Sequence, residues 1–285
     1  MAINLAEKFS PVVDERFEVE SKTSLIVNKD YDFVGAKTLK IYSVGTAEMN
    51  DYGRNTNIGN DEATGVLSRY GIIKDLSTEI QEVTMEKDRS FTFVIDKMDE
   101  DETLGALNAG TALARQLREV VIPEVDKYTY KKIADNAGNS KVETITTSNA
   151  YTSILTANET MDEAKVPSEG RVLVCTPAFY NLLKQDKNAV LETEIGQDMR
   201  IKGVIANMDG VTIQKVVSSL LPTGTNFILA HKIATTQAIK LAEYKPFTDT
   251  VLASGTVVVG RIYYTAFVRN NKKNAIYVST TEASL

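Results

Sequence analysis

Two stretches of alternating apolar and polar residues flank a long polar segment in the first third of the chain. Residues 37–45 (KTLKIYSVG) and 78–96 (TEIQEVTMEKDRSFTFVID) have the two-residue period of half-exposed strands. Residues 46–71 between them are rich in Gly, Asn and Asp, which is typical of a loop. The pattern predicts a long two-stranded ribbon closed by an elaborate tip. An isolated hairpin cannot bury enough surface in water, so its apolar face should lie on another molecule or a neighbouring subunit.

The longest helical pattern runs from residue 99 to about residue 136. Apolar residues recur there at intervals of three, four and seven, which predicts a helix of about 35 residues that spans roughly 50 Å. Pro123 lies inside the pattern, so we expect a kink or a break near residues 121–122. Gly138 is the expected breaker at the C-terminal end.

The densest acidic cluster in the chain, DKMDEDE at residues 96–102, stands directly before this helix. A calcium loop would need spaced carboxylates, a glycine and a distant glutamate, and the run lacks this spacing and the glycine. Acidic side chains at a helix start complement the positive end of the helix dipole. We therefore interpret residues 99–102 as a helix start and predict no metal site.

The second half of the chain has the pattern of a mixed α/β region. A helix with Ser148 as its expected N-cap is followed by an unbroken apolar run, residues 172–175, and by Thr176-Pro177, which is typical of a helix start. Asp209-Gly210 predicts a tight turn between two strands. The remaining expected elements are strands at residues 225–232, 238–244 and 257–268, a turn at 270–274 and a closing strand at 275–279.

The only cysteine, Cys175, would lie one residue before a helix N-cap, where the helix dipole can lower the pKa of a thiol. A cysteine nucleophile usually needs a base, and the chain has a single histidine, His231. Free cysteine is among the most often buried residue types. We therefore expect Cys175 to be a small apolar residue in the core, with a Cys175–His231 dyad as the minor alternative.

Composition, charge and the lack of known motifs argue against several classes of function. Charged residues make up 25% of the chain, hydrophobic residues 43%, and the net charge of −6 gives no basic footprint for specific DNA binding. No phosphate-binding loop, nucleophile elbow or zinc-protease motif is present. A single cysteine excludes an intrachain disulfide, and no apolar run approaches the ~20 residues of a membrane span. The first residues do not resemble a signal peptide, so we expect a product of the cytoplasm.

The joint order of these elements resembles the major capsid proteins of tailed bacteriophages, which share the Hong Kong ninety-seven fold. No single motif carries the resemblance, which extends over nearly the full length. The segments that carry it are VNKDYDFVGAKTLKIYSV and RSFTFVIDKMDEDET for the two sides of the extended loop, ALARQLREVVIPEVDKYTYKKI for the spine helix, GRVLVCTPAFYNLLKQD for the axial domain, and GRIYYTAFVRNNKKNAIYVS for the last strands of the peripheral domain.

The resemblance implies an α+β fold with four parts. These are an N-terminal arm (1–35), an extended loop (36–97), a peripheral domain with the spine helix (98–147 and 244–285), and an α/β axial domain (148–243). It also implies self-assembly into the hexamers and pentamers of an icosahedral head around the double-stranded DNA of a tailed phage. The protein would then be found in the virion after assembly in the host bacterial cytoplasm.

Partners follow from the same resemblance. They are other copies of the chain, a portal protein, packaged DNA bound without sequence specificity, and a separate scaffolding protein, since no coiled-coil-like leader precedes the arm. No cofactor, membrane, catalytic residue or metal ligand is implied. The candidate inter-subunit contacts are Arg54 and Arg69 near the tip of the loop, with Phe91 and Phe93 on its returning side.

Some members of the family join their subunits by a lysine–asparagine isopeptide bond. Lysines and asparagines are plentiful, for instance Lys37 and Asn271, but the sequence identifies no acidic partner for them. We predict no crosslink, which denaturing gels of mature particles would test by the absence of ladders above the monomer mass.

Two alternatives to a phage shell remain. One is an encapsulin-like nanocompartment, which has the same fold and differs in what it encloses. The other is a cytoplasmic thiol enzyme that uses Cys175, although an enzyme site should bring several titratable groups together.

Overall fold

The computed structural model describes residues 21, 23–31, 33, 36–54, 69–70, 75–102, 108–186, 207–250 and 253–281. The chain divides into two compact units. The smaller is residues 38–84, here called the ribbon unit, and the larger is formed by residues 1–37 and 85–285. Most of the expected arm, residues 1–20, lies outside the described residues.

The ribbon unit contains strands β1 (Thr38–Val44) and β2 (Thr78–Thr84), which pair antiparallel with Thr38 opposite Thr84. This is the ribbon that the alternating sequence predicts, but its returning strand is shorter than expected. The pattern at residues 78–96 breaks after Thr84, and the rest forms a separate strand, β3 (Lys87–Asp96). β3 belongs to a second sheet. There it pairs with β10 of the larger unit and not with β1.

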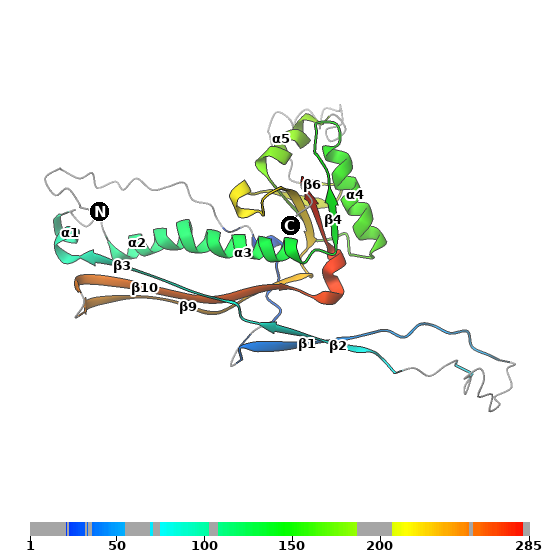
Figure 1. Ribbon diagram of the computed structural model, residues 1–285, viewed down its shortest axis with the longest axis horizontal. Helices are drawn as coiled ribbons and strands as arrows, with labels where there is room; N and C mark the ends of the chain where they lie inside the picture. Colours follow the sequence, from blue (N-terminus) through cyan, green and yellow to red (C-terminus); the bar gives the residue numbers. More distant parts are fainter. Residues whose placement is uncertain are drawn as a thin grey trace. The chain divides into compact units, whose positions relative to one another are not determined.

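A three-stranded antiparallel sheet in the order β3-β10-β9 forms one part of the larger unit. Strands β9 (Thr235–Thr250) and β10 (Ala253–Val268) extend the strands expected at 238–244 and 257–268. Figure 1 shows the helical segments running along this sheet. Val121 and Val125 of the helix pack there against Ile262 and Tyr264 of β10.

The predicted long helix is present in pieces. Helix α1 (Lys97–Glu102) comes first, and then α2 (Ala109–Gln116), a π-helical turn η2 (Leu117–Val121) and α3 (Ile122–Asp135) follow without a break. In the π-turn the N–H of Ile122 bonds to the carbonyl of Leu117, five residues back. Pro123 has no N–H and crowds the preceding turn, so the irregularity occurs where the sequence predicts it.

Gly138 follows the last turn of α3, as expected, and it also fits a close contact. A Cβ on Gly138 would lie 2.6 Å from the carbonyl carbon of Lys273. The N–H of Gly138 donates to the Lys273 carbonyl, 2.9 Å away. Glycine therefore lets the end of the helix approach the 3-10 turn η4 (Asn270–Ala275) that joins β10 to the next strand.

The second sheet has six strands in the order β4-β11-β8-β5-β7-β6. β11 pairs parallel with β4, β5 pairs parallel with β7, and the other neighbours are antiparallel. The bounds are β4 (Asn139–Val142), β5 (Arg171–Cys175), β6 (Asn207–Met208), β7 (Val211–Lys215), β8 (Thr225–His231) and β11 (Ile276–Thr280). The turn between β6 and β7 is the predicted one, since Asp209 and Gly210 both have positive φ.

Both faces of this sheet are covered. Side chains such as Val172, Ile228 and Ile276 belong to one buried cluster with residues of α3, including Tyr130. Alternate side chains, such as Leu173 and Phe227, belong to a second cluster with α4 (Ala150–Glu163) and α5 (Pro177–Gln185). A strand buried on both sides reads as a continuous apolar run, which explains the sequence of residues 172–175.

One local expectation is corrected. The N-cap of α4 is Asn149 and not Ser148, and the N–H of Tyr151 in its first turn donates to a carboxylate oxygen of Asp186, 3.0 Å away. In the segment expected to be the arm, Ile26 and Val27 are buried in the cluster beneath α3. This segment includes a 3-10 turn, η1 (Thr23–Leu25), and a bridge from Asn28 to Thr236.

No helix in the described ranges is long and apolar enough to cross a membrane.

Candidate assembly surfaces

Cys175 and His231 do not form a dyad. In the register of β5 and β8, Cys175 lies opposite Phe227 and Arg171 lies opposite His231, so the two residues are at opposite ends of the strand pair. Four residues of strand separate them by about 13 Å. The Nδ1 atom of His231 accepts from the N–H of Ile233, so Nε2 carries the proton and donates to the Glu169 carbonyl, 2.8 Å away.

The thiol of Cys175 is fully buried, and this burial raises its pKa to about 12, although Lys215 acts in the opposite direction. We expect Cys175→Ala to fold and assemble normally and to lose at most ~1 to 2 kcal/mol of unfolding free energy, because only a small cavity forms. The native thiol should not react with a thiol reagent until the protein is unfolded. Rapid labelling of the folded protein would contradict the burial of this group.

Arg54 and Arg69 lie together near the tip of the ribbon unit. The N–H of Gly53 donates to the carbonyl of Arg69 at 3.0 Å, so the two arginines flank one backbone contact between the outgoing and returning chains. Tyr52 and Tyr70 pack edge to face beside it, with ring centroids 5.1 Å apart. Tyr70 is nevertheless 77% exposed, which leaves an apolar and cationic surface open at this end.

Phe91 and Phe93 lie elsewhere. Both are half-buried in β3 of the larger unit, with their rings stacked at 6.3 Å. Phe91 also stacks on Tyr244 of β9 and crosses β10 at Gly260, where a Cβ would clash with its ring. Phe91 therefore has an internal packing role between the sheet and the helix. The two phenylalanines belong to the larger unit, and the two arginines belong to the ribbon unit.

A cluster of charges that the sequence analysis missed lies where the chain leaves the ribbon unit. The carboxylate of Glu86 accepts from the Tyr128 hydroxyl at 2.9 Å and from the Lys132 ammonium at 2.8 Å, both on α3. Partial burial raises the pKa of Glu86, but these hydrogen bonds outweigh it and lower the pKa below its usual range. One residue earlier, the N–H of Met85 donates to the Lys37 carbonyl at 3.0 Å. Within the larger unit, the chain segments that lead into and out of the ribbon are thus joined to each other.

The face of the three-stranded sheet opposite the helix carries a second surface that the sequence analysis missed. Val94, Val257 and Phe247 form a row across all three strands in this register. Val94 is 53% exposed and Phe247 is 46% exposed. The strand alternation could have indicated this face, because Val94 is the apolar member of the otherwise polar outward series Ser90, Thr92 and Asp96.

These surfaces are chemically suited to packing against protein. The ribbon unit exposes large apolar residues along both strands and at its tip, which are Tyr42, Val44, Met49, Tyr52, Tyr70, Leu76 and Ile80. Exposed apolar surface of this extent in one element marks an interaction site. In the described ranges, no group of three or more His, Cys, Asp or Glu residues is arranged to hold a metal ion.

Comparison with known families decides the identity. The family model described as phage capsid protein matches residues 78–279. The chain belongs to this phage capsid protein family. The match covers β2, β3, the helical segments and both sheets of the capsid protein, and it ends within β11. A comparison with curated protein sequences finds no significant match.

Solved structures show the same fold. A structure from Mycobacterium phage Che8 is 19% identical, with 99% of this chain and 100% of that chain covered and a TM-score of 0.78. The capsid structure of cyanophage P-SCSP1u is 14% identical, with coverages of 99% and 94% and a TM-score of 0.77. The mature capsid of bacteriophage PhiM1 is 10% identical, with coverages of 98% and 92% and a TM-score of 0.73. The resemblance to the Hong Kong ninety-seven fold is therefore confirmed.

Proposed function

We propose that this capsid protein is the shell subunit that forms the hexamers and pentamers of an icosahedral phage head around double-stranded DNA. The family match and the fold support a capsid role. Assembly from identical copies is supported by one observation: the ribbon unit exposes apolar residues on its strands and at its tip. A closed symmetric shell provides the same partner surface for every copy of such an element.

The parts of the chain take the following proposed roles. Residues 36–97 provide the extended loop, with its ribbon at 38–84 and its returning strand β3 joined to the peripheral sheet. Residues 98–147 and 244–285 form the peripheral domain, residues 148–243 the axial domain, and residues 1–35 the arm. Arg54 and Arg69 at the loop tip contact a neighbouring subunit, while Phe91 and Phe93 position the base of the loop from within the subunit.

Further partners belong to the same proposal. A separate scaffolding protein guides assembly in the host cytoplasm, a portal protein occupies one vertex, and the packaged DNA is enclosed without sequence recognition. The net charge of −6 is compatible with a wall that contains DNA, because packaged DNA brings its own counterions. The role is structural and needs no cofactor.

Negative-stain electron microscopy combined with sedimentation tests the proposal. The full chain is expressed alone and with its scaffolding partner, and each preparation is imaged and sedimented after purification. We expect uniform closed shells with the partner and at least capsomers without it. A monomer that persists under every condition would contradict the shell role.

A further inference from the structure

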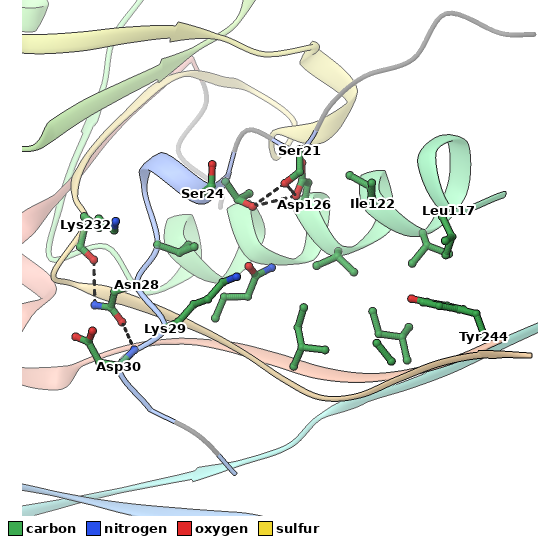
Figure 2. Close-up of a pocket in the computed structure, with 18 residues that line it drawn as sticks. Ser21, Ser24, Asn28, Lys29, Asp30, Leu117, Ile122, Asp126, Lys232 and Tyr244 are labelled. Atoms are coloured by element: carbon green, nitrogen blue, oxygen red, sulfur yellow. Dashed lines mark hydrogen bonds between the residues drawn. The ribbon is translucent and has the colours of Figure 1, made fainter. Parts of the chain in front are cut away.

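A groove of about 650 Å³ lies between the helix and the three-stranded sheet of the larger unit. Figure 2 shows Leu117 and Tyr244 toward one end of it, Lys232 and Asp30 toward the other, and Ser21 with Asp126 along one side. A volume of this size accommodates several apolar side chains. The apolar residues that line it come from the helix, from β9 and β10 and from the N-terminal segment, and they are Val27, Leu117, Val121, Ile122, Val125, Ile239, Ala242, Tyr244 and Ile262.

The floor of the groove is packed, but its wall on β9 is not. Val121, Val125 and Ile262 are buried in one cluster. Ile239, in contrast, remains 47% exposed, and Ala242 beside it is also exposed. The groove thus presents an open apolar wall to solvent in the isolated chain, which is a surface that favours a partner.

The first described residue of the chain, Ser21, lines this groove. The hydroxyls of Ser21 and Thr23 both donate to Oδ1 of Asp126, at 2.9 and 3.1 Å, and Asp126 is almost fully buried. These hydrogen bonds fix Ser21 at the groove side. Residues 1–20 therefore continue from a point that lines the groove, whatever path they take.

The sequence of residues 1–20 fits an apolar groove. Leu5, Phe9, Val12, Val13 and Phe17 recur at helical spacing on both sides of Pro11, which would kink or break a continuous helix. Only three residues separate Phe17 from Ser21, and the segment 14–20 contains four acidic residues and one arginine. At the groove, Lys29 and Lys232 line the wall, and neither ammonium forms an ion pair with a carboxylate of the described residues.

We propose that, in the unassembled subunit, residues 5–17 dock their apolar side chains into this groove of the same chain. A short tether raises the effective concentration of the segment to about the millimolar range, far above that of a second copy in a dilute solution. The docked segment covers Ile239 and Ala242 and places its acidic residues near Lys29 and Lys232. The inference concerns the free subunit and stands apart from the proposed shell, whose formation is measured separately.

Disulfide trapping tests the docking, and the single buried cysteine makes the experiment clean. In a Cys175→Ala background, Phe9→Cys is combined either with Ala242→Cys or with Glu243→Cys. Ala242 lines the groove, whereas Glu243 is the next residue of β9, is exposed, and lines a cavity on the other face. The two pairs therefore differ in the face of the sheet and hardly in distance along the chain. Circular dichroism melting establishes that both variants fold.

Both variants are oxidised as dilute monomers, and the products are separated on non-reducing gels and identified by peptide mass spectrometry. We expect an intramolecular disulfide from Phe9 to Ala242 to form at least about tenfold faster than one to Glu243. Adding Ile239→Glu to the Ala242 pair should remove this preference. Equal rates for the two pairs would overturn the proposal, and so would a disulfide-linked dimer, which would assign the groove to the segment of a second copy.

Discussion

Replacement of Arg171 by methionine should lower the free energy of unfolding by about 3–5 kcal/mol, the largest loss that we expect from a single side chain here. Arg171 is 3% exposed at the start of β5. Its guanidinium donates to the carbonyls of Pro167 and Val166 at 3.0 and 2.6 Å, and to the side chain of Asn158 at 3.1 Å. Methionine fills similar space but leaves these acceptors without a donor.

Urea unfolding followed by circular dichroism measures the loss. Two companion variants make the result specific. Asp162→Asn removes the charge of a 65% exposed partner that lies 2.6 Å from Arg171, and it should cost less than about 1 kcal/mol. Arg171→Lys should recover only part of the loss, because an ammonium cannot reproduce the planar fork. A stable Arg171→Met protein would show that the carbonyls find other donors.

Charge reversal at the loop tip should have the largest effect on assembly. Arg54→Glu and Arg69→Glu together place two carboxylates where the proposed contact with a neighbour presents two cations, so we expect shells to be lost. Both side chains are exposed, and surface changes of this kind alter folding stability by only about 0.5 kcal/mol. The folded subunit should therefore remain, with an unchanged melting curve.

Sedimentation and negative-stain microscopy measure this effect against a matched control. Arg54→Lys with Arg69→Lys keeps both charges and should form shells in normal yield unless the guanidinium geometry itself is needed. Shells of normal yield and diameter from the glutamate variant would show that the tip does not contact a neighbour through these arginines.

Features dictated by local chemistry could be predicted from the sequence. Thr176 accepts from the N–H of Phe179 as the N-cap of α5, and Asp209-Gly210 makes its turn with positive φ at both residues. The irregularity before Pro123 is likewise present. Each of these depends on a few neighbouring residues, so a short window of sequence contains the necessary information.

Features that depend on distant residues could not be predicted. The strand at 78–96 splits after Thr84 because Phe91 and Phe93 align with Gly260 and Val258 of β10, more than 150 residues later. Asn149, and not Ser148, is the N-cap of α4, and the distant Asp186 accepts from the N–H of Tyr151 in the first turn. Of the candidate contacts, Arg54 and Arg69 come near each other through the hairpin, in which Gly53 bonds to Arg69, whereas the inward position of Phe91 depends on packing against the helix.

The position of β11 in the six-stranded sheet has a consequence for the timing of synthesis. β11 lies between β4 and β8, yet it follows every other strand of that sheet in the sequence. While the ribosome makes the preceding strands, β4 has no sheet to join, and β8 has an unpaired edge. The six-stranded sheet closes only after residue 280 has left the exit tunnel. Subunits should therefore enter assembly as finished chains, and a nascent chain truncated before residue 276 should need a chaperone to stay soluble.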